Sequence, residues 1–200
     1  MSKIIEIDDG DLDRVVSQFA ATQKQIEVAR VRALRKTGRQ VGKLILAKVA
    51  KKERMPRRAL HNRVFVHPVK PGDDEAAIFI GTMPIDATMI GNPAQAARGV
   101  RVGRHSYPGA FVQSIYTNTP KVWIRLGSKH YDPARYPTRS RKGDRGGLSD
   151  PALMGRFPVV KAAVPIDGVV EDVAENLAAD VPPMFLKNFE HELNYEVNVK

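Results

Sequence analysis

The chain has 200 residues, no cysteine and a formal net charge of +10. This length can supply one domain with a full core, and the lack of cysteine excludes disulfides, thiolate metal sites and cysteine nucleophiles. No apolar run approaches the roughly 20 residues of a membrane-spanning helix, and no signal-peptide pattern opens the sequence. We therefore expect a soluble protein without a membrane partner.

The charge is distributed unevenly along the chain. Residues 14–70 hold 16 Lys and Arg against two acidic residues, a net of +14, whereas residues 161–200 hold three basic and eight acidic residues, a net of −5. The basic part could face the phosphates of a nucleic acid. It could instead meet the acidic part of a second copy in a head-to-tail assembly. A solvated helix face without a partner is the third interpretation.

The N-terminal part predicts a short arm at 1–13 and a long basic helix within 14–54. Apolar residues recur three, four or seven positions apart from Val15 to Val49, the period of one amphipathic helix. From Arg14 to Lys52 such a helix would be about 58 Å long, at about 1.5 Å per residue.

The polar face of this helix is almost entirely basic. Its candidate contacts with DNA, with a lumen or with a partner are Arg32, Lys36, Arg39 and Lys43. Gly38 and Gly42 lie four residues apart, and each costs about 1 kcal/mol against Ala in a helix. They could permit the close approach of another backbone or mark a bend, and we favour packing.

The middle of the chain predicts a mostly antiparallel sheet of about four or five strands. Val64–Val66 and Glu75–Gly81 flank a Pro-Gly turn, which is typical of a hairpin. Lys121–Leu126 alternates as a strand, and Phe157–Val164 is the last strand expected. The predicted regions are 63–126 and 157–164 for the sheet, and 128–156 for an extended basic surface loop.

The C-terminal part predicts a helical region at 166–195. Val169, Val173 and Leu177 share one face, and the Pro182-Pro183 pair predicts a kink or a fresh helix start. The candidate contacts with an adjacent subunit are the carboxylates of Glu171, Asp172 and Glu175. The expected fold is a single α+β domain with the long N-terminal helix and the C-terminal helix packed on the sheet.

The chain shows no pattern of catalytic or metal-binding residues. Its five histidines have no paired spacing for a metal, and no Gly-x-Ser-x-Gly nucleophile elbow occurs. We expect no enzyme activity, no catalytic residue, no metal and no cofactor.

One motif is more specific than the helices. The run Ala97–Phe111 reads ARGVRVGRHSYPGAF, and Arg98, Arg101 and Arg104 carry its positive charge. It resembles the signature of the minor tail protein Z family of lambda-like tailed phages, also called tail completion proteins. Pro56–Leu60 and Phe157–Lys161 are similar to further segments of that family. The resemblance covers about residues 14–195 and departs at 128–155, which is longer and more basic.

The resemblance implies a structural virion protein at the head-proximal end of a phage tail, in the head–tail joining region, and in the host cytoplasm during assembly. It implies a homo-oligomeric ring, with a hexamer as the candidate, beside the tail terminator protein and the head–tail connector or neck proteins. Viral double-stranded DNA is a further candidate partner, contacted through the basic helix and the motif. The alternative is a free-standing basic nucleic-acid-binding protein, whose affinity for duplex DNA would fall steeply with salt.

Overall fold

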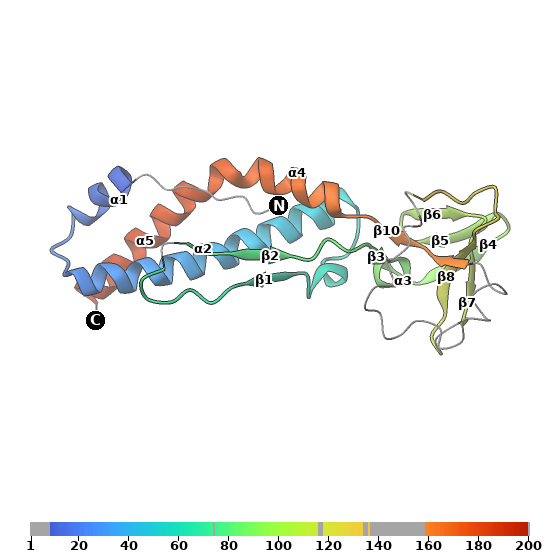
Figure 1. The fold of residues 1–200 in the computed structure, drawn as a ribbon, viewed down its shortest axis with the longest axis horizontal. Helices are drawn as coiled ribbons and strands as arrows, with labels where there is room; N and C mark the ends of the chain where they lie inside the picture. The colour runs from blue at the N-terminus through green and yellow to red at the C-terminus, as the bar shows by residue number, and fades with distance from the viewer. Residues whose placement is uncertain (1–8, 74, 116–117, 134–135, 137–158, 200) are drawn as a thin grey trace. The chain divides into compact units, whose positions relative to one another are not determined.

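The computed structural model describes residues 9–73, 75–115, 118–133, 136 and 159–199. It confirms the α+β class, with a long N-terminal helix, C-terminal helices and small antiparallel sheets (Figure 1). The packing of the chain divides into two compact units. The first unit comprises Met1–Val49, His61–Gly81 and Val169–Lys200, and the second comprises Ala50–Leu60 and Thr82–Gly168.

The N-terminal helical region is two helices and not one. Helix α1 spans Asp9–Val16, and helix α2 spans Gln23–Lys52, so α2 is about 45 Å long. The prediction of a continuous helix from Arg14 is wrong because the helical bonding pattern ends after Val16. The backbone N–H groups of Gln18 and Phe19 donate to carbonyl oxygens only three residues back, and residues 20–22 are not helical. The chain restarts through a capping box, in which Gln25 Oε1 accepts from the backbone N–H of Thr22 and Thr22 Oγ1 accepts from that of Gln25.

The C-terminal region also divides. Helix α4 spans Asp167–Leu177, the 3₁₀ turn η3 spans Ala178–Asp180, and helix α5 spans Val181–Asn198 with its two prolines in the first turn. The Pro182-Pro183 pair therefore marks a fresh helix start, where proline is tolerated because no intrahelical hydrogen bond is lost.

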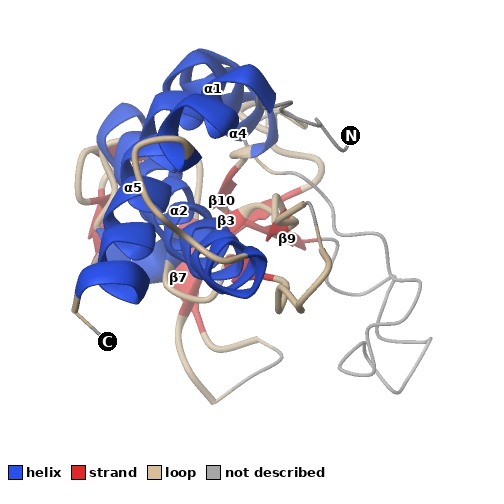
Figure 2. Cartoon of the chain, turned by 90° about the vertical axis from the view of Figure 1, so that its left-hand side faces the viewer, coloured by secondary structure: helices blue, strands red, loops and turns tan. Residues whose placement is uncertain are grey.

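The core of the first unit lies between α2 and α5, which run antiparallel side by side (Figures 1 and 2). Small residues of α2, Ala29 and Ala33, are fully buried against the larger Phe185, Phe189 and Leu193 of α5. The two phenyl rings stack with their centroids 6.0 Å apart. This arrangement buries the apolar stripe that the sequence predicts on α2, and it uses α5 to do so.

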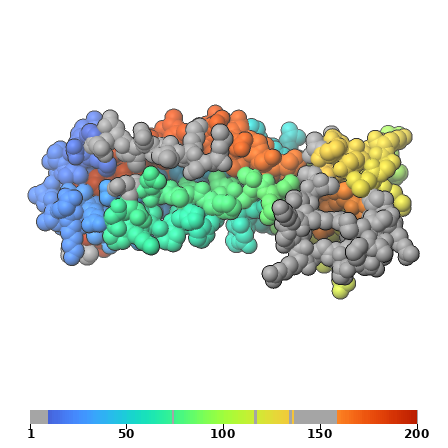
Figure 3. Space-filling model, in the orientation of Figure 1, coloured from blue at the N-terminus to red at the C-terminus, as the bar shows by residue number. Residues whose placement is uncertain are grey.

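A two-stranded antiparallel hairpin, β1 (Val64–Val66) and β2 (Ile78–Ile80), packs on another side of α2. A Cβ atom added to Gly42 would lie 2.7 Å from Val64 Cγ1, and one added to Gly38 would lie 3.0 Å from Val66 Cγ1. The two glycines therefore admit this strand, as expected. The hairpin lies on the surface (teal to green in Figure 3), with its outward-facing Phe65 and Phe79 exposed.

The second unit holds the remaining strands. They are β3 (Ile85–Asp86), β4 (Pro93–Ala96), β5 (Gly99–Val102), β6 (His105–Pro108), β7 (Phe111–Gln113), β8 (Lys121–Arg125), β9 (Val159–Lys161) and β10 (Ala163–Val164). They pair in the orders β4-β5-β6, β7-β8-β9 and β10-β3. Trp123 on β8 is buried, and its indole N–H donates to the carbonyl oxygen of Gln113 at 2.8 Å.

Within the described residues, the strands form four small sheets, and not the one sheet of four or five strands expected. The strands are only two to five residues long, because proline and glycine recur between them and end the pairing. Short helical turns, α3 (Ala87–Ile90) and η1 (Arg57–Leu60), complete this unit. Of the predicted loop at 128–156, only 128–133 and Tyr136 are among the described residues.

Candidate charged interface

The basic face of α2 forms an open groove in the first unit. Helix α2 carries ten Lys and Arg against the single Glu27, and five of these cations converge on one surface. The groove has a volume of about 500 Å³ and is lined by Arg32, Arg35, Lys36, Arg39, Gln40, Lys43 and Glu192. All four α2 residues predicted as contacts are in this set, so the structure brings them together.

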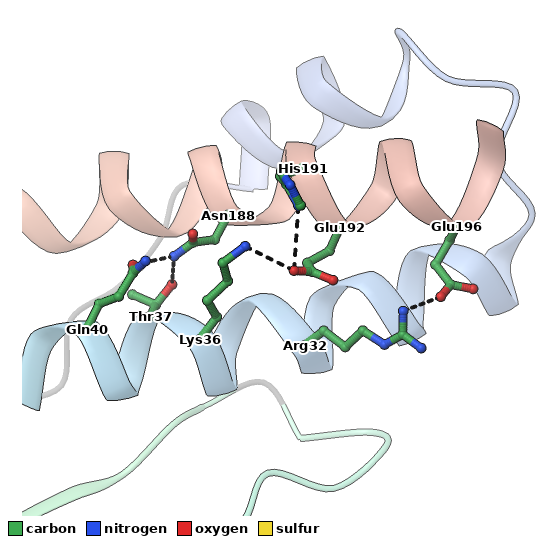
Figure 4. Close-up of polar contacts among 8 residues, drawn as sticks. All are labelled: Arg32, Lys36, Thr37, Gln40, Asn188, His191, Glu192 and Glu196. Carbon is green, nitrogen blue, oxygen red and sulfur yellow. Dashed lines mark hydrogen bonds and ion pairs between the residues drawn. The ribbon is translucent and has the colours of Figure 1, made fainter. Parts of the chain in front are cut away.

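Two of these cations are paired with α5 of the same chain (Figure 4). Arg32 forms an ion pair with Glu196, whose side chain is only 5% exposed. Lys36 Nζ lies 3.2 Å from Glu192 Oε1, and His191 Nδ1 lies 3.7 Å from the same oxygen. The paired residues are four positions apart on both helices. Residues with this spacing share one face of a helix, so the two pairs lie one above the other where the antiparallel helices meet.

A buried amide continues this seam. Asn188 Nδ2 donates hydrogen bonds to Thr37 Oγ1 at 2.9 Å and to Gln40 Oε1 at 2.8 Å. Both Asn188 and Thr37 are buried, where a polar group without a partner would cost about 1–3 kcal/mol. These hydrogen bonds, with the two ion pairs, favour one register of α5 on α2.

A second row of cations lies outside this seam. Arg35, Arg39 and Lys43 are spaced four apart on α2 and are all exposed. The guanidinium of Arg35 donates to the carbonyl oxygen of Val69. Within the part of the chain that the structure describes, no ion pair or side-chain hydrogen bond holds Arg39 or Lys43. This row is called the basic strip below.

The acidic counterpart lies on α4. Glu171, Asp172 and Glu175, the predicted subunit contacts, are exposed on this helix. Asp167 begins the helix and is exposed as well. Asp167, Glu171 and Glu175 are spaced four apart and are called the acidic strip below. None of the described residues that line the basic groove comes from α4.

The three arginines of the motif lie in the second unit and do not form one cluster. Arg101 is on β5, Arg98 precedes that strand and Arg104 follows it in the turn to β6, so the last two lie at opposite ends. All three are exposed, and Arg101 Nε donates to the carbonyl oxygen of Gly103. They provide separate positive charges along a hairpin.

The glycines of the motif have structural roles. Gly99 has a φ of +144°, and a Cβ atom there would lie 2.2 Å from the carbonyl oxygen of Tyr107. Gly103 and Gly109 adopt positive φ in the turns that follow β5 and β6. His105 also has a structural contact, because its Nε2 lies 3.0 Å from the carbonyl oxygen of Glu53 and must be a donor there. The motif is therefore explained by its fold, apart from its exposed arginines.

One ionisable group of the second unit is perturbed. Burial raises the pKa of Asp86, but hydrogen bonds from Thr88 and the charge of Lys121 outweigh it, so the pKa lies below its ordinary value. Lys121 Nζ lies 3.3 Å from Asp86 Oδ2. The carboxylate caps α3 by accepting from the backbone N–H of Thr88 at 2.9 Å. This cluster is a helix cap with an ion pair.

The described residues hold no group of three or more His, Asp or Glu that could bind a metal ion. Of the helices that the structure describes, none is long and apolar enough to cross a membrane. The residues that sequence reasoning missed are Glu192, Glu196 and Asn188. Their spacing of four indicates that they share one face of α5, next to its apolar residues. Only the packing shows that this face meets α2.

Comparison with protein-family models, with curated proteins and with solved structures finds no match to this chain.

Proposed function

We propose that this protein is a structural component of a phage tail, at the head-proximal end in the head–tail joining region, where it assembles as a homo-oligomeric ring. The observation that carries the proposal is that one chain exposes both a basic groove on α2 and an acidic face on α4. Opposite charged surfaces on one chain suit head-to-tail contacts, which close into a ring when the rotation between copies permits. The motif Ala97–Phe111, with its resemblance to tail completion proteins, supports the proposed location.

The partners in this proposal are other copies of the chain, the tail terminator protein and the connector or neck proteins. Viral double-stranded DNA would pass through the ring, and the exposed arginines of the motif are candidates to contact it. The observation that favours the alternative, a free-standing nucleic-acid-binding protein, is the same basic groove. That alternative predicts tight duplex binding by the monomer, with log affinity falling in proportion to log salt.

Mass spectrometry of purified phage particles tests the proposal. We expect the protein in intact particles and in isolated tails, at a stoichiometry of a small ring. Its absence from particles, together with salt-dependent duplex binding by the monomer, would establish the alternative. When the protein is missing, we expect assembly to leave heads and tails that are not joined, which electron microscopy would show.

A further inference from the structure

We propose that the basic strip of α2 binds the acidic strip of α4 from a second copy of the chain. This inference rests on the proposed homo-oligomer, because it names the contact through which the copies would assemble. Arg35, Arg39 and Lys43 provide three exposed cations, and Asp167, Glu171 and Glu175 provide three exposed carboxylates. Both rows have a spacing of four residues, or about 6 Å along a helix.

The chain already contains one contact of this kind. Arg32 and Lys36 on α2 pair with Glu196 and Glu192 on α5, and each pair of residues is spaced four apart. The basic strip lies beside this seam on the same helix and borders the same groove. An acidic helix in the groove would therefore add a second set of ion pairs next to the first.

The occupant is a second copy and not the same chain. The acidic strip does not line the groove of its own chain within the described residues. A second copy carries the same acidic strip, and its own exposed basic strip can bind a third copy, so the contact propagates.

The spacing also sets the geometry of the contact. Rows with a spacing of four form the ridges that cross at an interhelical angle of about −50° when two helices pack through them. Arg39 and Glu171 are the middle members of their rows, so they face each other whichever way α4 runs. Arg35 and Lys43 then flank this central pair.

The test is a charge-reversal experiment on the full chain, with sedimentation velocity as the readout. The basic-strip variant is Arg39→Glu with Lys43→Glu, and the acidic-strip variant is Glu171→Lys with Glu175→Lys. We expect the wild type to self-associate more weakly as salt rises. Each variant alone should show a dissociation constant raised by about 10- to 100-fold, because attraction is replaced by repulsion.

An equimolar mixture of the two variants is the decisive sample. The strip on α2 is now net acidic in one variant, and the strip on α4 is net basic in the other. We therefore expect the mixture to assemble into alternating oligomers while neither variant does so alone. The matched control is Lys24→Glu with Lys48→Glu, which makes the same charge change at exposed positions of α2 outside the groove. This control should associate as the wild type does.

Three results would overturn the inference. They are a wild type that stays monomeric at about 100 μM in low salt, single variants that associate as tightly as the wild type, and a mixture no better than its components. Binding of duplex DNA that the basic-strip variant loses, without any change in self-association, would assign the groove to nucleic acid instead. Far-UV circular dichroism checks that each variant is folded, and Glu171→Gln with Glu175→Gln replaces the acidic-strip variant if it is not.

The outcome is separate from that of the proposed function. If the protein is found in phage particles but its charge-reversed variants still assemble, the proposed function stands and the proposed interface is wrong. If the protein is absent from particles but passes the mixing test, the interface stands and the proposed location in the tail is wrong.

Discussion

At the residue scale, Gly99 shows how a motif glycine is required by backbone geometry. Its φ of +144° is rarely adopted by other residues, and a Cβ atom would collide with the backbone at Tyr107 and Pro108. We expect Gly99→Ala to lower the free energy of unfolding by about 2–4 kcal/mol, since strain and overlap add. Urea unfolding followed by the fluorescence of Trp123, in the same unit, measures the change.

Gly127→Ala is the matched control for this prediction. A Cβ atom at Gly127 meets no atom within 4 Å, so we expect a change within about 0.5 kcal/mol. Equal unfolding curves for the two alanine variants would contradict the structural role of Gly99.

The ionised carboxylate of Asp86 predicts that the stability of the fold depends on pH. Its pKa in the folded protein lies below its ordinary value, so the charged carboxylate stabilises the fold above the unfolded pKa, about 4. This contribution is lost as the pH falls through the lower, folded pKa. Asp86→Asn keeps an acceptor for the cap of α3 but loses the charge facing Lys121. The wild type should exceed the variant in stability at neutral pH, and the difference should shrink toward pH about 2.

Unfolding midpoints of wild type and Asp86→Asn across this pH range check the sign. A difference that stays constant down to the lowest pH would show that the ionised carboxylate contributes nothing.

At the scale of elements, the ion pair between α2 and α5 is more buried than one within α1. Glu196 is 5% exposed, whereas the ion pair of Arg14 and Asp11 in α1 has side chains that are 72% and 42% exposed. Solvent screens the second pair more strongly. A double-mutant cycle with Arg32→Ala and Glu196→Ala should therefore give a coupling energy of about 1–2 kcal/mol.

The same cycle on Arg14 and Asp11 should give less than about 0.5 kcal/mol. Both cycles are measured by urea unfolding with far-UV circular dichroism. Equal coupling energies would mean that burial on α5 does not strengthen the seam.

At the scale of the whole molecule, each unit has a core of its own. Phe189, 1% exposed, lies in the core of the first unit, and Trp123 lies in the second. Phe189→Ala should cost about 3–5 kcal/mol. We expect it to lower the urea midpoint of the helical signal, which comes mainly from α2, α4 and α5, more than the midpoint of Trp123 fluorescence.

Val122→Ala is the reciprocal variant, because Val122 is 1% exposed in the second unit. It should lower the Trp123 midpoint more than the helical one. If both variants shift both signals equally, the two units unfold as one cooperative block.

The elements that sequence reasoning located best are those with local signals. The hairpin around Pro71-Gly72, the packing role of Gly38 and Gly42, and the strand at Trp123 follow from turn residues, helix propensity and alternation, and the structure confirms them. The break before α2 was also locally encoded, in the capping pair Thr22 and Gln25. It was missed because the apolar period continues through Phe19 and hides the stop.

Only the tertiary structure shows which segment packs against each face of a helix. Periodicity and local charge along the sequence were enough to predict the α+β class, the basic α2 and the acidic C-terminal region, because both are properties of a local stretch. Only the packing decided that Glu192 and Glu196 neutralise part of α2 within one chain and that Arg39 and Lys43 remain exposed in the groove. It also decided that short strands distribute over several sheets. The physical reason is that segments more than 150 residues apart pair in the register that buries the most apolar surface. A local sequence pattern does not show how much surface each possible register would bury.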